Sequence, residues 1–369
     1  MIIESVNLEN YRNYKNLYME FDDGTNILYG DNAQGKTNIL EALYMCGTAK
    51  SHRGSKDSEI IRFGKNESHI KLIVKKNDVP YRIDIHLKKS KSKGIAINGM
   101  PIKKVSELFG IVNVIFFSPE DLAIIKNGPA ERRKFIDMEL CQIDKFYVHN
   151  IVNYNKILTQ RNKLLKDLSF NYDDSLYATL DIWDMQLADY GNKIIKRREE
   201  FIHQINEIIC DIHNRLSGGR ESIHLVYEPN TIYENLLKEI TDSRNRDIKL
   251  KTTTVGPHRD DLGFYIKDMD IRKYGSQGQK RTAALSLKLS EIELVKKIIN
   301  DEPVLLLDDV MSELDSNRQN QLIESLDGIQ TIVTCTGLDE FIENRVKVNK
   351  IYRIINGTYK LYEEVKNEK

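Results

Sequence analysis

Apolar and polar residues alternate in two stretches near the start of the chain, residues 1–30 and 68–100. A period of two predicts β-strands with one buried face. Turn residues at 22–24 (Asp-Asp-Gly) and 77–80 (Asn-Asp-Val-Pro) would separate these strands. Near the other end, 301–310 and 331–337 are short apolar runs bounded by turn residues, which is typical of buried strands in an α/β sheet.

The middle of the chain has a helical period instead. Apolar residues recur at helical spacing from 132 to 165 and from about 176 to 216, on either side of the polar segment 169–175. Two long helices joined by a short polar turn predict an antiparallel pair. The predicted fold class is therefore α/β, a head domain whose two parts are separated by an inserted helical lobe.

This pattern predicts three segments along the chain. Residues 1–117 would form the N-terminal part of the head, 118–221 the helical lobe, and 222–369 the C-terminal part of the head. We find no internal repeat and no low-complexity linker between them.

Composition limits the classes of partner and compartment. The 55 basic and 55 acidic residues give a net charge of zero, so a nucleic-acid partner would have to be met by a local basic patch. The four cysteines form no C-x-x-C pair, and no apolar run approaches the ~18 residues that span a bilayer. With no signal-peptide pattern at the N-terminus, we expect a cytoplasmic protein with no membrane segment.

A phosphate-binding motif lies near the start of the chain. Residues 30–37, Gly-Asp-Asn-Ala-Gln-Gly-Lys-Thr, match G-x-x-x-x-G-K-[ST] between a predicted strand and a predicted helix. Lys36 would bind the β- and γ-phosphates of ATP, and Thr37 would ligate Mg²⁺. The expected nucleotide contacts are Gly30, Asp31, Asn32, Ala33, Gln34, Gly35, Lys36, Thr37 and Asn38.

A second metal-site element is expected where an apolar strand ends in acidic residues, and residues 303–309 (Pro-Val-Leu-Leu-Leu-Asp-Asp) have this form. Asp308 would complete the Mg²⁺ site, and Asp309 stands where many ATPases place a water-polarising glutamate. Thr37 and Asp308 are 271 positions apart (37 to 308), and no guanine-reading N-K-x-D motif occurs. A large insertion between the two halves of the site is typical of ABC ATPases of the SMC type.

That class requires a signature loop whose free backbone N–H groups, at the start of a helix, reach the γ-phosphate bound by a partner chain. Residues 216–220 (Leu-Ser-Gly-Gly-Arg) look familiar, but they end a helical pattern, so Gly218 or Gly219 is predicted to be its left-handed C-cap. Residues 274–281 instead begin a helical pattern. Here Ser276 and Gly278 would contact the partner's γ-phosphate, and Gln277 and Gln279 would shape the loop. The alternative is a simple glycine-containing helix start.

Of the other elements expected in an ABC ATPase, the D-loop is matched, but the switch histidine and the Q-loop glutamine are not. Residues 311–315 (Met-Ser-Glu-Leu-Asp) resemble a D-loop, with Ser312, Leu314 and Asp315 at the matching places. No switch histidine follows the last strand, where Cys335 or Thr336 stands. No Q-loop glutamine is evident, and Ser118 and Glu120 occupy that region. Because an aspartate at 309 is shorter than a glutamate, we expect switch-like hydrolysis well below about one turnover per second.

Seven blocks of the sequence, in order, resemble the RecF family of bacterial recombination mediators. They are LENYRNY, GDNAQGKTNILEAL, FFSPEDL, GPAERRKFID, GPHRDDL, YGSQGQKR and LLLDDVMSELD. The resemblance implies an SMC-like head with a short helical lobe, and an ATP-dependent homodimer on duplex DNA and single-strand/double-strand junctions at the nucleoid. It also implies slow ATP hydrolysis with Mg²⁺, and partnership with RecR and RecO in placing RecA at single-strand gaps.

The family resemblance leaves the Gly-Pro-His-Arg-Asp-Asp segment, 256–261, unexplained. His258, Arg259 and Asp260 would either contact a nucleotide-bound interface or form a buried structural network.

DNA contacts are predicted at a basic turn between two strands, residues 86–94. Lys88, Lys89, Lys91 and Lys93 could follow phosphates there without reading bases. A solvated turn is the alternative interpretation, and the basic residues 132–134 are a second location for the contacts.

Three other functions compete with the DNA-clamp interpretation. A transporter's nucleotide-binding subunit would carry a switch histidine and a Q-loop. A purely structural chromosome-organising head would have a much longer coiled coil than 132–216 can supply. A scaffold that holds nucleotide without turnover is the strongest rival, because of Asp309, and a phosphate-release assay separates it.

Overall fold

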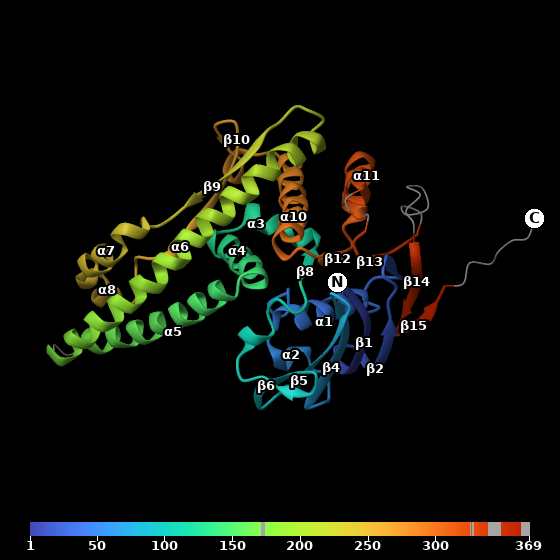
Figure 1. Cartoon of the computed structure of the whole chain (residues 1–369), viewed down its shortest axis with the longest axis horizontal. Helices are drawn as coiled ribbons and strands as arrows, with labels where there is room; N and C mark the ends of the chain where they lie inside the picture. The colour runs from blue at the N-terminus through green and yellow to red at the C-terminus, as the bar shows by residue number, and fades with distance from the viewer. Residues whose placement is uncertain (171–173, 325, 327, 339–347, 363–369) are drawn as a thin grey trace, which may run out of the picture. The chain divides into compact units, whose positions relative to one another are not determined.

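The computed structural model describes residues 1–170, 174–324, 326, 328–338 and 348–362. The chain divides into two compact units, Met1–Asp121 with Glu291–Lys369, and Leu122–Ser290 (Figure 1). They are called the head unit and the helical unit below. In the described parts of the chain, no helix combines the length and the apolar character needed to cross a membrane.

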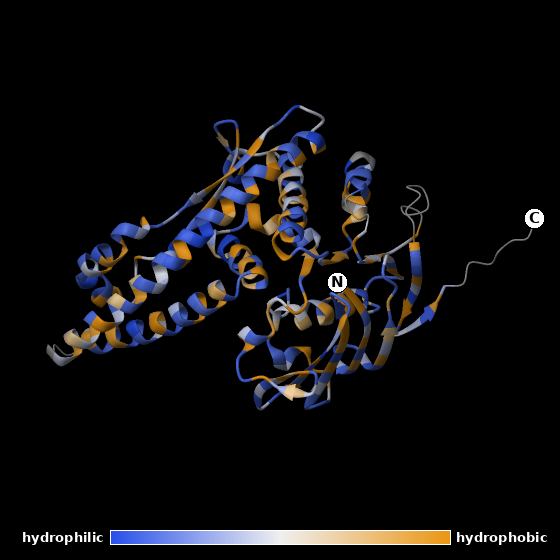
Figure 2. Ribbon diagram, viewed as in Figure 1, coloured by the Kyte–Doolittle hydropathy of each residue, from blue (hydrophilic) through white to orange (hydrophobic). Residues whose placement is uncertain are grey.

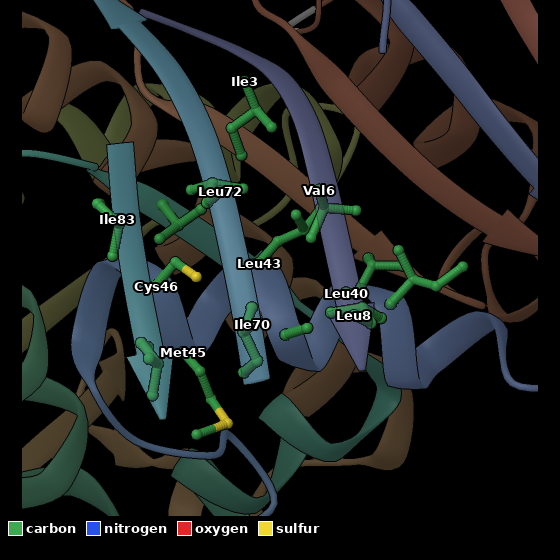
Figure 3. Packing of buried hydrophobic residues seen from close by; sticks show 14 of the residues in the cluster. Ile3, Val6, Leu8, Leu40, Leu43, Met45, Cys46, Ile70, Leu72 and Ile83 are labelled. Atoms are coloured by element: carbon green, nitrogen blue, oxygen red, sulfur yellow. The ribbon is translucent and has the colours of Figure 1, made fainter. Parts of the chain in front are cut away.

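The head unit contains an antiparallel sheet in the order β2-β1-β4-β5-β6-β7. Its strands are β1 (Ile2–Tyr11), β2 (Tyr14–Glu20), β4 (Glu67–Lys76), β5 (Val79–Lys88), β6 (Lys91–Ile97) and β7 (Met100–Pro101). Buried and exposed residues alternate along β1 and β4, as the period of two predicted. Figure 3 shows strand residues packed on helix α1 (Lys36–Thr48), with Leu72 near Leu43 and Cys46 and Leu8 near Leu40.

A second sheet of the head unit combines strands from both ends of the chain, in the order β15-β14-β3-β13-β12-β8. Its strands are β3 (Thr25–Tyr29), β8 (Val114–Phe117), β12 (Val304–Asp308), β13 (Thr331–Cys335), β14 (Val348–Ile355) and β15 (Thr358–Leu361). All neighbours pair in parallel except β14 and β15. The split α/β domain is therefore confirmed, and the carboxyl ends of β3, β12 and β13 lie at one edge of the sheet, where ligands of parallel sheets bind.

Short helices complete the head unit within its described residues. They are α2 (Asp57–Ile60) and α11 (Ser316–Glu324), together with the end of α10 (Gln277–Ile299).

The helical unit is built on the antiparallel pair α5 (Lys145–Leu168) and α6 (Asp174–Leu216), which run side by side (Figure 1). Figure 2 shows apolar and polar residues mixed along both helices, as amphipathic helices require. The remaining helices are α3 (Leu122–Lys126), α4 (Pro129–Ile143), α7 (Leu236–Asp242), α8 (Arg244–Leu250) and α9 (Ile271–Tyr274), with the start of α10. A small sheet, β11-β10-β9, comprises β9 (Ile223–Glu228), β10 (Asp261–Ile266) and β11 (Met269–Asp270).

The continuous helix predicted over 132–165 is wrong, because the chain breaks between α4 and α5. Asp144 has an extended backbone (φ −139°) and its carboxylate accepts hydrogen bonds from the N–H groups of Phe146 and Tyr147. An N-cap of this kind begins a new helix.

Residues 222–290 lie in the helical unit, whereas the sequence-based segmentation placed 222–369 together in the head. The reason is packing of β9 along α6: the Asn206 side chain both accepts from the N–H and donates to the C=O of Leu225, each at 2.8 Å. Strand character alone did not show which unit these strands would join.

Candidate functional site

The phosphate-binding loop joins β3 to α1 at the carboxyl edge of the parallel sheet. Gly30 and Gly35 have φ of 146° and 113°, a region that other residues rarely adopt. A Cβ atom at Gly30 would lie 2.5 Å from the Ile354 carbonyl oxygen, and one at Gly35 would lie 2.6 Å from Asn13 Nδ2. Both positions therefore require glycine, and α1 begins at Lys36 with its first N–H groups facing this loop.

The β1–β2 turn supports this loop. Asn13 Nδ2 donates to the Gln34 carbonyl at 2.9 Å, and Tyr14 Oη donates to the Gly35 carbonyl at 3.1 Å. Asn38 also donates to Asn13 Oδ1. We did not predict these supporting residues, since no local motif connects the turn at 11–14 with a loop some twenty residues later.

Lys36 lies within the loop itself. Its Nζ donates to the carbonyl oxygens of Gly30 (2.5 Å) and Asp31 (3.2 Å), and the residue is almost fully buried. These carbonyl oxygens hold the ammonium group at the loop, beside the start of α1, where free N–H groups favour an anion such as phosphate.

Thr37 and Asp308 meet, although 271 positions separate them. Thr37 Oγ1 donates to Asp308 Oδ1 at 2.8 Å, and Thr334 Oγ1 donates to the same oxygen at 2.7 Å. Burial raises the pKa of Asp308 in spite of these two hydrogen bonds. A hydroxyl beside a carboxylate, in a place where a cation would stabilise the ionised form, fits Mg²⁺.

Asp309 has a left-handed backbone (φ 51°), which non-glycine residues adopt at a cost. Its N–H donates to both the carbonyl (3.2 Å) and the Oγ1 (3.0 Å) of Thr334, so one threonine holds both acidic residues. Thr334 is a candidate site residue that the sequence analysis missed. The signal lies in the register of β12 and β13, which pairs Asp308 with Thr334.

A cavity of about 190 Å³ opens beside these acids. Its lining comprises Asp309, Met311, Ser312, Thr334, Cys335, Thr336 and Gly337. The cavity thus brings together Asp309, the predicted D-loop serine Ser312, and Cys335 and Thr336, which stand where a switch histidine is expected. Asp315 instead caps α11 by accepting from the Arg318 N–H at 3.0 Å.

The Q-loop region stays apart from these contacts. Ser118 follows β8 and is buried, and its N–H donates to Asp121 Oδ2 at 2.7 Å. No described hydrogen bond joins Ser118 or Glu120 to the phosphate-binding loop.

The predicted signature residues lie at the start of α10, in the helical unit. The Ser276 N–H donates to Gln279 Oε1 (2.9 Å) and the Gln279 N–H donates to Ser276 Oγ (3.2 Å), a reciprocal capping box. Ser276, Gln277 and Gly278 are exposed. A Cβ at Gly278 would meet nothing closer than Ser276 Oγ, at 3.9 Å. Packing within the chain therefore gives no reason for a glycine here.

The other candidate, Leu-Ser-Gly-Gly-Arg, ends a helix as predicted. Helix α6 stops at Leu216, and Gly218 and Gly219 have φ of 66° and 77°. The Gly219 N–H closes the turn by donating to the Asn214 carbonyl at 2.8 Å.

The segment 256–261 takes part in a buried network of the helical unit. Arg198 Nη1 donates to Asp260 Oδ2 at 3.0 Å, and Tyr227 also donates to this carboxylate. His258 Nδ1 lies 2.6 Å from Tyr154 Oη. Burial lowers the pKa of His258 to about 4. These contacts favour the structural network for His258 and Asp260, whereas Arg259 is exposed.

The lysines predicted to contact DNA separate into two groups. Lys93 Nζ donates to Asp57 (2.9 Å) and to the Ala49 carbonyl, and Lys88 pairs with Glu67 at 3.5 Å. Lys89 and Lys91 are exposed.

The basic residues 132–134 are the second predicted location for DNA contacts, and two of them form hydrogen bonds within the chain. Arg132 is buried and bidentate to Asp261. Arg133 donates to the Asp260 carbonyl at 2.6 Å.

Comparisons with known proteins agree with this architecture. A family model described as the RecF/RecN/SMC N terminal domain matches residues 2–360. The "DNA replication and repair protein RecF" of Lachnospira eligens is 66% identical over 357 residues, which cover 97% of this chain and 98% of that protein.

Two solved structures of the recombination mediator protein RecF in the RecFOR pathway share the fold, each with a TM-score of 0.90. RecF-ATPrS is 36% identical and covers 98% of both chains, and RecF-ATP is 37% identical and covers 98% of this chain and 97% of its own. The predicted fold class, an ABC- and SMC-like P-loop ATPase head with an inserted helical lobe, is confirmed, and the chain belongs to the RecF family.

Proposed function

We propose that this chain is an ATP-dependent DNA-binding protein of recombinational repair and replication. It dimerises on DNA with ATP, hydrolyses the ATP slowly, and helps RecO and RecR to load RecA at single-strand gaps. The observation that carries the ATPase part is the contact between Thr37 and Asp308 across 271 positions. The DNA, RecO, RecR and RecA parts rest on family membership, because the solved relatives are described as mediators of the RecFOR pathway.

Each site residue has a role in this proposal. Gly30, Asp31, Asn32, Ala33, Gln34, Gly35 and Asn38 form the loop that surrounds the phosphates of ATP, and Lys36 holds the β- and γ-phosphate oxygens. Thr37 and Asp308 would hold Mg²⁺, which neutralises phosphate charge when bound. Asp309 orients the attacking water from the cavity wall. Its short side chain positions that water weakly, so turnover is slow.

The γ-phosphate side of the site is completed by a second copy of the chain. Ser276, Gln277 and Gly278 are exposed at the start of a long helix, where free N–H groups favour an anion, and Gln279 braces the loop through its bond to Glu221 (2.8 Å). ATP is therefore held between two protomers, and hydrolysis releases the dimer.

The proposed location is the cytoplasmic nucleoid. The predicted segments 1–117, 118–221 and 222–369 follow the order of the motifs along the chain, whereas the compact units group residues 222–290 with the helical lobe. The proposed DNA partners are duplex DNA and single-strand/double-strand junctions. Lys89 and Lys91 are the predicted phosphate contacts that the described ion pairs leave available, while Lys88 and Lys93 contribute charge from paired positions.

Size-exclusion chromatography without nucleotide, with ADP and with ATP tests the dimer. We expect dimers only with ATP, and none for Ser276→Arg, whose long side chain would block the approach of the partner's phosphate. Thr159→Arg is the matched control, because it adds the same charge on an exposed face of α5 in the same unit. A chain that stays monomeric with ATP contradicts the proposal.

Phosphate release from the same samples separates the remaining rival. A nucleotide-holding scaffold would dimerise with ATP and release no phosphate. Single-turnover hydrolysis faster than roughly ten per second would contradict the slow switch.

A further inference from the structure

One aromatic side chain on the head unit has no protein environment at all. Phe63 is 101% exposed, more than any other large apolar residue that the structure describes. It lies between α2 and β4, in a segment that turns at Gly64 (φ 78°). A fully exposed phenyl ring gains no stabilisation from burial, so the stability of the chain does not explain this position.

The segment around Phe63 is anchored at both ends. The Arg62 N–H donates to the Asn10 carbonyl at 2.8 Å, and the Lys65 N–H donates to the Arg62 carbonyl at 3.0 Å. The Lys89 N–H then donates to the Asn66 carbonyl at 3.1 Å. This last bond joins the segment to the tip of the β5–β6 hairpin, close to α2, which packs on β5 (Figure 1).

These anchors place Phe63 among exposed lysines. Lys65 lies two residues away on the same turn, and Lys89 and Lys91 lie at the adjoining hairpin tip. Among the described residues none of these three lysines forms an ion pair, whereas Glu67, the nearest acid along the strand, is paired with Lys88. We call Phe63, Lys65, Lys89 and Lys91 the aromatic–basic edge.

The chemistry of this edge fits a nucleic-acid strand better than a protein. A protein interface would need a wider apolar patch around the ring. Among the other exposed apolar residues of this sheet, Val79 and Met100 lie at its opposite end, where β4 turns into β5 and β6 into β7, and Tyr18 lies on the edge strand β2. A single aromatic ring flanked by cations is the arrangement on which an unpaired base stacks while lysines neutralise its phosphates.

We propose that the aromatic–basic edge binds single-stranded DNA, with Phe63 stacked on an unpaired base and the three lysines on the flanking phosphates. The inference rests on the proposed DNA-binding function and names the part of the DNA that the head unit contacts. Bases inside a duplex are already stacked on their neighbours and are unavailable to the ring. Phe63 therefore contacts the single-stranded side of a junction or gap.

Tryptophan fluorescence tests this directly, because the chain has one tryptophan, Trp183. In the full chain carrying Trp183→Phe and Phe63→Trp, we expect an oligothymidylate to quench the emission of residue 63, and a blunt duplex to leave it unchanged. Phe63→Ala should weaken binding of the oligothymidylate by about tenfold, while Phe63→Tyr retains it. Affinity for the blunt duplex should stay the same in both variants.

The outcomes distinguish the two levels of inference. If wild type binds the oligothymidylate but residue 63 is not quenched and Phe63→Ala binds normally, the edge is not the contact, and the proposed function stands. If wild type binds neither DNA, the proposed function fails. Loss of the ATP-dependent dimer in Phe63→Ala, with DNA affinity intact, would make the ring a protein contact and overturn the proposal.

Discussion

Thr334 connects the two acidic residues of the proposed ATPase site. It donates to Asp308 and accepts from the Asp309 N–H, so a single hydroxyl fixes the metal-binding carboxylate and the backbone of its neighbour. Asp309 needs this support because its left-handed backbone is intrinsically costly.

Thr334→Val should keep the shape of the strand and remove the hydroxyl. We expect ATP binding to persist, and phosphate release to fall by roughly tenfold or more, since a hydrogen bond to a charged group contributes about 1.5–3 kcal/mol. Thr331→Val is the matched control on the same strand, where the hydroxyl donates to the Ile329 carbonyl and, in the part of the chain that the structure describes, to no acidic residue. Equal hydrolysis by the two variants would remove Thr334 from the mechanism.

His258 makes the stability of the helical unit depend on pH. Burial lowers its folded pKa from 6.5 to about 4. Below pH ~6.5, His258 is therefore protonated in the unfolded chain but stays neutral in the folded chain. The free energy of unfolding falls as the pH drops toward ~4. Between pH ~7 and ~5 we expect His258 to account for a loss of about 2 kcal/mol in the free energy of unfolding. Chemical denaturation of wild type and His258→Gln measures it, and an identical pH dependence in both would contradict the assignment.

The start of α10 is the element on which the proposed trans part of the site depends. The capping box of Ser276 and Gln279 provides hydrogen-bond partners for N–H groups at the start of the helix. This agrees with the alternative interpretation of the sequence, a simple glycine-containing helix start. The glycine in the first turn is not explained by that role, because space surrounds it. An alanine would suit the helix better by up to about 1 kcal/mol.

Gly278→Ala should therefore leave the melting temperature unchanged or slightly raised, while ATP-dependent dimerisation and hydrolysis are lost. The added methyl group would stand where the partner's phosphate approaches the backbone. Gly191→Ala is the contrasting control, since its Cβ would lie 2.6 Å from Leu236 Cδ2 inside the same unit. That variant should lose stability instead. If Gly278→Ala dimerises and hydrolyses ATP like wild type, α10 begins with an ordinary cap and has no role in trans.

At the scale of the whole molecule, the proposed site is shared between two copies of the chain. One copy supplies Lys36, Thr37, Asp308 and Asp309, and the other supplies Ser276 and Gly278. A symmetric dimer then contains two equivalent sites.

Mixing two inactive variants tests this sharing. Lys36→Ala and Ser276→Arg should each hydrolyse ATP at a background rate, because neither variant can assemble an intact site with copies of itself. A mixed dimer has both defects in one site and none in the other, so phosphate release should rise well above that of either variant alone. A mixture no more active than its separate components would place both sets of residues in one chain's own site.

The features that the sequence determined by itself are those set by near neighbours. Residues 30–37 form the phosphate-binding loop because two glycines with special backbone angles, a strand and a helix follow one another directly. The C-cap at Gly218 and Gly219 is local in the same way. The helix break at Asp144 could also have been predicted from the sequence, since a capping aspartate is a local signal.

Motifs predicted the meeting of Thr37 and Asp308, but the tertiary structure decided which other distant side chains meet. Thr334 reaches Asp308 because β13 lies beside β12 in parallel register, and Asn13 reaches the phosphate-binding loop because β1 turns back next to it. Lys93 is paired with Asp57, and residues 222–290 join the helical unit. A pattern of residues fixes which face of a strand or helix is buried, but strand order and packing partners arise from contacts far apart in the chain.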